Sequence, residues 1–179
     1  IARHLEAVER GDITRLMIFM PPRHGKSHLV SLHFPSEDLA KGFQRFVKDM
    51  SGKGFAGKGP GTAVGIGGAG KLCGKGFDLC IIDDPDGSDV SEQSKWAYRD
   101  SISARLKPDG AIVLVASRRP SDLASHLLQA SNEGWQVLSF PAMNGGVPLD
   151  SQWYGVEKYR QIRMSIGEDN WQSLYQQVA

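Results

Sequence analysis

Four runs of mostly apolar residues recur along the chain, and they are too continuous in hydrophobicity for half-exposed strands. They span Ile13–Met20, Asp78–Asp83, Ala111–Ser117 and Trp135–Phe140. Strands that are buried on both faces have this pattern, as they do in parallel sheets covered by helices. The runs therefore predict strands in the interior of a folded domain.

Between and after these runs, apolar residues recur at the spacing of helices. This spacing predicts helices over residues 1–10, 36–50, 91–106, 122–130, 156–166 and 169–177. Ser36 and Ser121 are candidate N-caps, Lys107–Gly110 has the residues of a turn, and Thr62–Gly68 has the alternation of a short hairpin. Strands alternating with helices indicate an α/β fold with a mostly parallel central sheet flanked by helices.

The pattern loosens at Asn144, which two glycines and a proline soon follow, and this composition indicates a linker. We therefore expect one domain over residues 1–143 and a linker with a helical segment over residues 144–179. Because the first residue is Ile1 rather than Met, and because the last helical residues have no recognisable stop, we expect the natural chain to extend at both ends.

Composition restricts the class of protein. The chain has 179 residues and a formal net charge of +1, which suits one globular domain with a real core. This charge gives no general attraction to nucleic acid or membrane, so any DNA contact must come from a local patch. No apolar run reaches the length of a membrane span, and no signal peptide is visible. Cys73 and Cys80 have no metal-ligand partners at useful spacing, which favours free thiols in a reducing compartment.

The first candidate site follows the first predicted strand, in the stretch Met20–Ser27, which ends in Gly-Lys-Ser. A strand, a tight loop, Gly-Lys-Ser and a helix are the parts of a phosphate-binding loop. Backbone N–H groups and a helix N-terminus surround a polyphosphate in such loops, while the lysine reaches the outer phosphates and the serine hydroxyl holds Mg²⁺.

The composition of this loop departs from the general pattern. Met20 stands where a glycine is usual, and Pro21 and Pro22 have no N–H to donate. The donors must then come from Arg23, His24, Gly25, Lys26 and Ser27. A strand-to-helix turn with a chance Gly-Lys-Ser is the alternative interpretation.

Two carboxylates, Asp83 and Asp84, end the second predicted strand, which Pro85 stops. A phosphate-loop hydrolase needs an acidic residue at this strand tip to hold the Mg²⁺ shell. The second carboxylate, which strand alternation would point the other way, can orient or deprotonate an attacking water. An acidic turn after a strand is the alternative, and the upstream Gly-Lys-Ser favours the functional interpretation.

The third predicted strand also ends in polar residues, Ser117, Arg118 and Arg119. A hydroxyl and an arginine at this tip could sense a γ-phosphate or couple its loss to motion. A solvated entry to the next helix is the alternative.

Taken in order, these pieces resemble the ATPase half of the large subunit of tailed-phage terminases. The residues that carry the resemblance span nearly the whole chain. They are Pro21–Ser27, Ser36–Ala40, Gly65–Gly68, Gly74–Asp78, Ile81–Pro85, Arg105–Pro108, Asp122–Ala124, Phe140–Ala142 and Leu174–Gln177. The resemblance implies a three-layer P-loop NTPase fold of the RecA-like (ASCE) kind.

The resemblance also implies roles for the candidate residues. Lys26 and the loop N–H groups would hold the phosphates of ATP, and Arg23 matches a loop arginine that contacts the γ-phosphate. Asp84 would act on the water, in a place often held by a glutamate. Mg²⁺ would be organised by Ser27 and Asp83. The nucleotide-binding residues implied in this way are Pro22, Arg23, His24, Gly25, Lys26, Ser27, Ser117 and Arg118.

The function implied by the family is that of a DNA-packaging motor, an Mg²⁺-dependent ATPase that drives double-stranded viral DNA into a procapsid. Its partners would be the portal protein, the terminase small subunit and further copies of the chain in a ring. It would act in the host cytoplasm at the portal vertex, with no membrane. Lys75, Arg99 and Arg105 are candidates for a finger that reaches a neighbouring site.

Three features depart from the family pattern. Asp84 is one methylene shorter than a glutamate. The family's usual strand between the loop helix and the Ser36 segment is missing, and we expect residues to be absent from the chain near Pro35–Ser36 and Met50–Ser51. The family's nuclease lies beyond the ATPase half, and no carboxylate cluster replaces it, so we expect no nuclease activity from this chain.

Two other functions remain open. Another nucleic-acid ATPase, such as a helicase, would want a second motor domain or aromatic contacts to single strands, and neither is evident. A non-catalytic scaffold for capsid assembly, with a degenerate loop, is favoured by Met20 and Asp84. Retention of Lys26, Ser27 and Asp83 argues against it, because a scaffold needs none of them.

Overall fold

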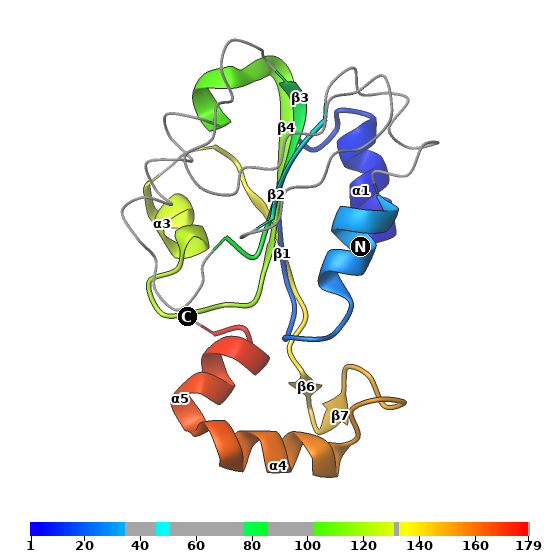
Figure 1. Cartoon of the computed structure of the whole chain (residues 1–179), viewed down its shortest axis with the longest axis vertical. Helices are drawn as coiled ribbons and strands as arrows, with labels where there is room; N and C mark the ends of the chain where they lie inside the picture. Colours follow the sequence, from blue (N-terminus) through cyan, green and yellow to red (C-terminus); the bar gives the residue numbers. More distant parts are fainter. Residues whose placement is uncertain (35–45, 51–76, 86–101, 131–132, 179) are drawn as a thin grey trace.

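The structure, a computed structural model, describes residues 1–34, 46–50, 77–85, 102–130 and 133–178. In this part of the chain a central sheet stands between helices, and a smaller helical segment lies beyond one end of the sheet (Figure 1). The fold is a mixed α/β one with a parallel central sheet, as the alternation of apolar runs and helical segments predicted.

Five described strands form the central sheet, and each neighbouring pair is parallel. They are β1 (Arg15–Phe19), β2 (Phe46–Met50), β3 (Phe77–Asp83), β4 (Leu106–Ala116) and β5 (Gln136–Ser139). Their order across the sheet is β2-β3-β4-β1-β5. The first strand of the chain is therefore an interior one, with β4 on one side and β5 on the other.

One face of the sheet packs against α1 (Ala2–Glu9) and η1 (His28–His33), a wide-turned helix that follows the loop after β1. Leu5 of α1 and Val30 of η1 join the strand residues Ile18, Ile81 and Val113 in one buried cluster. Side chains alternate between the two faces of a strand, so the intervening strand residues belong to the opposite face.

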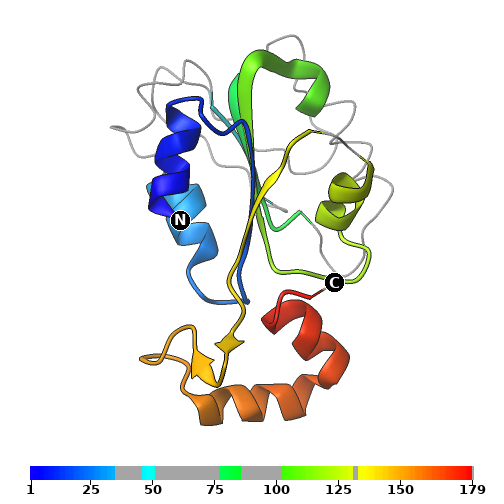
Figure 2. The ribbon, with the colours of Figure 1, turned by 180° about the vertical axis from the view of Figure 1, so that it is seen from behind.

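The opposite face packs against α3 (Leu123–Ala130), whose Leu123 and Leu127 contact a second cluster that contains Phe19 and Ile82. A short helix, η4 (Ser103–Arg105), precedes β4. Figures 1 and 2 show α1 and η1 on one side of the sheet and α3 on the other. This arrangement explains the continuous hydrophobicity of the central strands, which are covered on both faces.

The last part of the chain lies beyond the carboxyl end of the sheet (Figure 2). It consists of the hairpin strands β6 (Met143–Asn144) and β7 (Val147–Pro148), then α4 (Val156–Ile166), α5 (Glu168–Asn170) and η5 (Trp171–Tyr175). Ala142, Tyr159 and Trp171 are buried together and form a small core of this segment. No described helix is both long and apolar enough to cross a bilayer.

The helix predicted over residues 36–50 is wrong at its C-terminal end. Phe46–Met50 form β2, which pairs with β3 from Phe46 opposite Leu79 to Met50 opposite Asp83. The apolar spacing fitted a helix, but the parallel ladder with β3 decides the conformation. Residues 36–45 and the predicted hairpin at 62–68 lie outside the described residues, as do the junctions at Pro35–Ser36 and after Met50. The chain thus has a strand, β2, between η1 and β3. It follows the Ser36 segment, whereas the strand expected from the resemblance would precede that segment.

The turn predicted at Lys107–Gly110 lies within β4, as does Leu106, which was predicted to end a helix. The pairing with β3 passes from Phe77 opposite Leu106 to Leu79 opposite Ala111. Two steps along β3 therefore correspond to five along β4, and the extra residues form a bulge. The turn-forming residues interrupt the ladder without ending the strand. The rest of the predicted helix, residues 91–101, lies outside the described residues.

The N-cap of α3 is Asp122 and not Ser121. Asp122 Oδ1 accepts a hydrogen bond from the Ser125 N–H over 2.7 Å, which is the contact of an N-cap side chain with the first turn. Ser121 instead has a left-handed φ of 58°. The helices predicted at residues 1–10 and 156–166 are confirmed, with ends shifted by one residue at most.

Candidate functional site

The connections that follow β1 and β4 leave the sheet in opposite directions. After β1 the chain turns to η1 on the face of α1, whereas after β4 it turns to α3 on the other face (Figure 1). Because β1 and β4 are neighbours, the two loops diverge from one point at the carboxyl end of the sheet. Open parallel sheets bind ligands at such switch points.

Two polar contacts join the loop of residues 20–27 to the tip of β3, although β4 lies between β1 and β3. Lys26 Nζ lies 3.0 Å from Asp84 Oδ2, and the Ser27 hydroxyl donates to Asp83 Oδ1 over 2.9 Å. Lys26 and Asp83 are buried, whereas the Asp84 side chain is 40% exposed. A buried ammonium needs an anion beside it, and in this structure the Asp84 carboxylate is that anion.

Asp84 lies just past the end of β3. Its N–H donates to the Val115 carbonyl over 2.8 Å, and its φ of 50° is left-handed. This backbone turn ends the strand alternation, so the expectation that Asp83 and Asp84 point in opposite directions does not hold. Both carboxylates reach the loop of residues 20–27.

The backbone of the loop has the geometry of an anion-binding turn. Arg23 and Gly25 have left-handed φ values of 62° and 77°, and such values in a residue other than glycine are most often kept at functional sites. Among the described residues, none accepts a hydrogen bond from the main-chain N–H of Arg23, His24 or Gly25. Unpaired N–H groups before a helix are donors available to a ligand.

His24 links this loop to the C-terminal segment. Its Nδ1 lies 2.8 Å from the Pro22 carbonyl, and its Nε2 lies 2.6 Å from the Tyr159 hydroxyl. Because a carbonyl only accepts, Nδ1 carries the proton, and in that single-proton tautomer Nε2 accepts the Tyr159 O–H. The ring also stacks on Tyr154, with centroids 4.4 Å apart. The His24 ring therefore fixes the loop from outside, and its two nitrogens are not available to a ligand.

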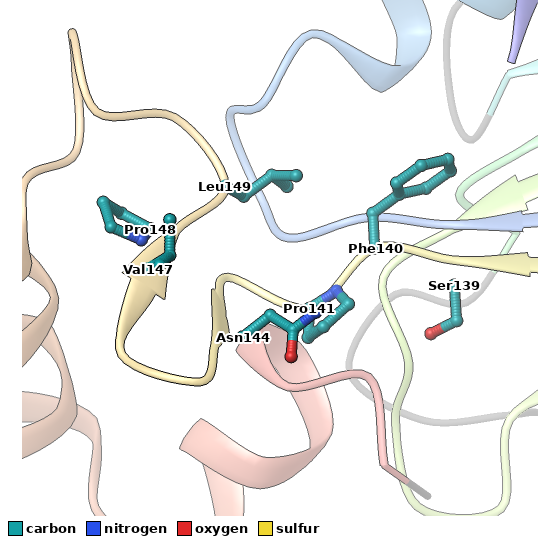
Figure 3. A pocket seen from close by; sticks show the side chains of 7 residues that line it. All are labelled: Ser139, Phe140, Pro141, Asn144, Val147, Pro148 and Leu149. Atoms are coloured by element: carbon teal, nitrogen blue, oxygen red, sulfur yellow. The ribbon is translucent and has the colours of Figure 1, made fainter.

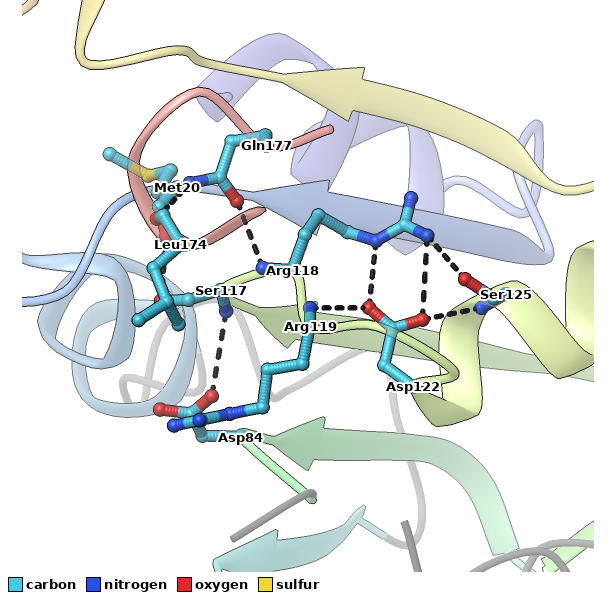
Figure 4. Close-up of polar contacts among 9 residues, drawn as sticks. All are labelled: Met20, Asp84, Ser117, Arg118, Arg119, Asp122, Ser125, Leu174 and Gln177. Atoms are coloured by element: carbon cyan, nitrogen blue, oxygen red, sulfur yellow. Dashed lines mark hydrogen bonds and ion pairs between the residues drawn. The ribbon is translucent and has the colours of Figure 1, made fainter. Parts of the chain in front are cut away.

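The exit of β4 places Ser117 beside the loop of residues 20–27 and the tip of β3; we call the residues that meet there the crevice. The Ser117 hydroxyl donates to the Met20 carbonyl over 2.9 Å, and its N–H points to Asp84 Oδ1 at 3.5 Å (Figure 4). Ser117 thus lies between the start of the loop and the tip of β3. The sequence predicted a hydroxyl at the tip of this strand, and Ser117 follows the last residue of β4; its contact with a γ-phosphate stays a prediction.

Arg118 is held away from the crevice. Its Nε donates to Asp122 Oδ2 over 2.7 Å, an Nη donates to the Ser125 hydroxyl over 2.6 Å, and its guanidinium covers the Phe19 ring at 4.5 Å. The side chain is buried in this ion pair on the face of α3. Arg118 was predicted to bind nucleotide, and the structure gives its guanidinium a different set of partners.

Arg119 was not among the predicted site residues. Its N–H donates to Asp122 Oδ2 over 3.0 Å, and its side chain extends toward Asp84 in Figure 4. Its Nε is buried without a hydrogen-bond partner among the described residues. A buried guanidinium N–H with no acceptor is uncommon in a folded protein, and here it adjoins the crevice. Arg118 and Arg119 are adjacent in the sequence, and no sequence pattern distinguishes the arginine that pairs with Asp122 from the one that faces Asp84.

The C-terminal segment also contributes Gln177, which sequence reasoning did not assign a role. Gln177 is buried, and its Oε1 accepts the Arg118 N–H over 3.1 Å. Burial raises the pKa of Tyr175, and the nearby Arg23 cation opposes that rise. Both loops of the crevice are therefore in contact with residues 159–177. Lys75 and Arg99 lie outside the described residues, while Arg105 precedes β4 and lies at the opposite end of the sheet.

Few protein atoms are available for a metal ion at this site. In the part of the chain that the structure describes, no three His, Cys, Asp or Glu side chains come together as a metal-binding group. Mg²⁺ needs no such cage, because it keeps several waters and takes one or two protein ligands together with substrate phosphates. Ser27 and Asp83, in contact with each other, fit that requirement.

Comparison with known proteins gives no assignment. No family model matches the chain, and the search of curated proteins found no similar sequence.

Proposed function

We propose that the chain is an Mg²⁺-dependent ATPase with a P-loop of the RecA-like kind. The observation that carries the proposal is the pair of contacts between consecutive residues. Lys26 and Ser27 on the loop meet Asp84 and Asp83 at the tip of β3. A turn with a chance Gly-Lys-Ser has no reason to bring its lysine and serine to two carboxylates on a strand two positions away in the sheet.

Each of these residues has a distinct role in the proposal. Lys26 exchanges its contact with Asp84 for a contact with the β- and γ-phosphates, and the free N–H groups of residues 23–25 hold the phosphate oxygens. Once released, the Asp84 carboxylate orients the attacking water or accepts its proton. Ser27 and Asp83 hold the metal ion, which would neutralise charge on the phosphate oxygens when bound.

Ser117 and Arg119 supply the third side of the proposed site. Arg119 replaces Arg118 as the arginine that contacts the γ-phosphate from the β4–α3 loop, because Arg118 is bound to Asp122. Arg23 is the second candidate for this contact from the loop itself. The Ser117 hydroxyl is hydrogen-bonded to the Met20 carbonyl. In the proposal, a movement of the loop at Met20 therefore moves the exit of β4 as well.

The wider role that we propose is that of a DNA-packaging motor of tailed phages. The order of motifs along the sequence supports this role, as do the contacts of Lys26 and Ser27 with Asp84 and Asp83, where two of those motifs meet. In this proposal the partners are double-stranded viral DNA, the portal protein, the terminase small subunit and other copies of the chain in a ring. The place of action is the portal vertex of the procapsid in the host cytoplasm.

Phosphate release from ATP and Mg²⁺ tests the proposal, measured with and without double-stranded DNA. We expect Lys26→Ala to lower turnover by about a hundredfold, the effect typical for loss of a positioned charge donor. Lys107→Ala is the matched control, because Lys107 Nζ also pairs with an aspartate, Asp78, over 2.8 Å, but at the amino end of the sheet. It should retain the parent's rate.

The result that would refute the ATPase proposal is a folded parent protein that neither binds ATP nor releases phosphate. Equal rates for the parent and Lys26→Ala would refute the role of the loop. If double-stranded DNA leaves the rate of turnover unchanged, the proposed ATPase activity stands and the proposed role as a DNA-packaging motor is contradicted.

A further inference from the structure

Tyr159 connects α4 to the loop that follows β1. Its side chain is 1% exposed. Its ring lies among three other rings of the C-terminal part of the chain, with centroids 5.6, 5.8 and 6.4 Å from those of Tyr154, Trp171 and Tyr175. Buried hydroxyls in folded proteins have hydrogen-bond partners. Among the described residues, the partner of this hydroxyl is His24 Nε2, at 2.6 Å.

His24 stands between the two left-handed residues of the loop, Arg23 and Gly25. Its ring is held at both nitrogens, by the Pro22 carbonyl and by the Tyr159 hydroxyl. A residue other than glycine keeps a left-handed φ only where its surroundings hold it there. Because the Cβ of a residue is bonded to its backbone, a ring held at both nitrogens also restricts the backbone beside it. The Tyr159 hydroxyl therefore supports the geometry in which the N–H groups of the loop are aimed at a ligand.

The C-terminal segment, residues 142–178, is closed on itself. The Ala142 N–H donates to the Tyr175 carbonyl over 2.7 Å. The Gln176 side-chain amide accepts from the Met143 N–H and donates to the Met143 carbonyl, each over 3.1 Å. The last turn of the segment is thus bound to its first residues, so a shift of α4 requires a shift of the whole segment.

A cavity of about 480 Å³ lies between the hairpin of this segment and the end of β5. Figure 3 shows Val147 and Pro148 of the hairpin on one side of it and Phe140 with Ser139 on the other. Protein interiors are close-packed and have few spaces of this size, so the hairpin adds little packing between the segment and the sheet at this place. The attachment of the segment to the loop through Tyr159 has correspondingly more weight.

We infer that Tyr159 is a positioning residue for the loop of residues 20–27, and that through His24 it couples the docking of the C-terminal segment to the binding of phosphates in the loop. With the hydrogen bond made, a phosphate meets donors that are already ordered. With the bond broken, only a fraction of the molecules has the binding geometry, and the apparent affinity falls by that fraction. The inference rests on the proposed function, because it concerns the regulation of the same site.

The coupling acts in both directions. If docking of the segment raises the affinity of the loop for phosphate, bound phosphate must tighten the docking by the same factor. A phosphate held by the N–H groups of the loop would thereby slow the opening of α4, on the other side of His24.

Calorimetry with inorganic tripolyphosphate and Mg²⁺ tests the positioning role. Tyr159→Phe removes the hydroxyl and keeps the ring. We expect it to bind tripolyphosphate about fivefold more weakly than the parent, or by about 1 kcal/mol. Tyr154→Phe is the matched control, since Tyr154 also stacks on His24 but its hydroxyl has no hydrogen bond to any described residue. It should bind within about twofold of the parent.

A second variant separates this hydrogen bond from other effects of Tyr159. His24→Phe removes both ring nitrogens and keeps an aromatic ring at this position. Changes at two residues that act through one bond are not additive. The double variant, with His24→Phe and Tyr159→Phe, should therefore bind tripolyphosphate as weakly as His24→Phe alone. A further fivefold loss in the double variant would show that Tyr159 acts on the loop by another route, and would contradict the inference.

Trypsin cleavage within α4 measures the reverse direction, because Lys158, Arg160 and Arg163 are exposed on this helix. Tripolyphosphate is added at the same multiple of each protein's Kd, so that the general stabilisation by bound ligand is equal. We expect the ligand to slow cleavage in the parent and in Tyr154→Phe about fivefold more than in Tyr159→Phe.

The outcomes distinguish this inference from the proposed function. If the parent binds tripolyphosphate and Tyr159→Phe binds it within about twofold, Tyr159 has only a structural role and the phosphate loop stands. The same conclusion follows if the ligand slows cleavage equally in all three proteins. If the parent binds neither tripolyphosphate nor ATP, the proposed function fails and the coupling fails with it.

Discussion

At the scale of single residues, Asp84 is both the partner of the loop lysine and the proposed base. Its Oδ2 lies 3.0 Å from Lys26 Nζ, in a contact where the lysine is buried and the carboxylate is partly exposed. An anionic ligand must displace this carboxylate before it can use the lysine. In the proposed site Asp84 would therefore lower the affinity for phosphate, because it competes for the same cation.

Asp84→Asn separates these two effects. The amide keeps the shape but removes the negative charge, so we expect ATP to bind as tightly as to the parent or more tightly. Hydrolysis should fall by about a hundredfold, since an amide cannot accept the water's proton. Calorimetric ATP affinity and single-turnover phosphate release measure the two quantities. Unchanged hydrolysis would remove Asp84 from the chemistry, and weaker binding would contradict the competition.

The sequence could predict those candidate site residues that are recognised from their own short stretch of sequence. Lys26, Ser27 and Asp83 could be found because a loop after one buried strand and an acid after another both fall at the carboxyl end of a parallel sheet. The bond from His24 to Tyr159 could not be found, because 135 positions separate its partners. The sequence also could not show whether Arg118 or Arg119 pairs with Asp122, because this depends on how α3 packs.

At the scale of elements, the start of α3 organises the exit of β4. The Asp122 carboxylate caps the helix and also accepts from the Arg118 guanidinium and the Arg119 N–H. It is 2% exposed, and Arg118 is 8% exposed. The helix start and the β4–α3 loop therefore depend on one buried carboxylate, and the direction of Arg119 depends on it as well.

Asp122→Ala should lower the free energy of unfolding by about 3–5 kcal/mol, because it removes the cap and leaves the Arg118 charge buried without a partner. Urea denaturation of parent and variant measures this. Asp12→Ala is the control, since Asp12 pairs with Arg10 over 2.9 Å where both side chains are about 60% exposed. We expect it to cost less than about 1 kcal/mol. A similar loss of unfolding free energy in the two variants would show that the buried Arg118–Asp122 pair stabilises the fold no more than the exposed Arg10–Asp12 pair.

The sequence was least informative where tertiary pairing decides the conformation of an element. Apolar residues at helical spacing predicted a helix through Phe46–Met50, and the ladder with β3 makes it a strand. Continuous apolar runs gave the central strands correctly, because burial on both faces leaves its pattern in the residues themselves. Pairing between distant segments leaves no comparable local pattern.

At the scale of the whole molecule, the C-terminal segment is in contact with both loops of the crevice. Tyr159 bonds His24 on one loop, and Gln177 bonds the Arg118 N–H on the other. Burial raises the pKa of Tyr159 to about 12, and the charge of Asp150 adds to the rise. The phenol therefore stays protonated at any physiological pH, and its O–H is the donor to the single-proton tautomer of His24.

This shift predicts a stability change at high pH. The ordinary pKa of the phenol is 10.0 and its folded value is about 12, so the unfolded chain releases the proton first as the pH rises. The contribution of Tyr159 is complete below pH 10 and is lost between about pH 10 and pH 12. Tyr159→Phe, which has no proton to lose, should show a smaller loss of stability between pH 9 and pH 11.5 in urea denaturation.

Tyr154→Phe is the control for this measurement. Tyr154 also stacks on His24, but its hydroxyl has no hydrogen bond to any described residue. It should keep the parent's dependence on pH. At pH 8, Tyr159→Phe should cost about 1 kcal/mol for the unpaired His24 nitrogen, which Tyr154→Phe should not. Identical pH profiles for the parent and Tyr159→Phe would contradict the role assigned to this phenol.

The bulge in β4 gives the molecule an attachment point for experiments on its motion. Pro108 and Asp109 are exposed there, at the amino end of the sheet, whereas the loops of the crevice and the C-terminal segment lie at the carboxyl end. A short peptide tag inserted between them lengthens a segment that already departs from the ladder. A surface-tethered molecule would then present the carboxyl end of its sheet to solution, where the proposed ligands could be tested one at a time.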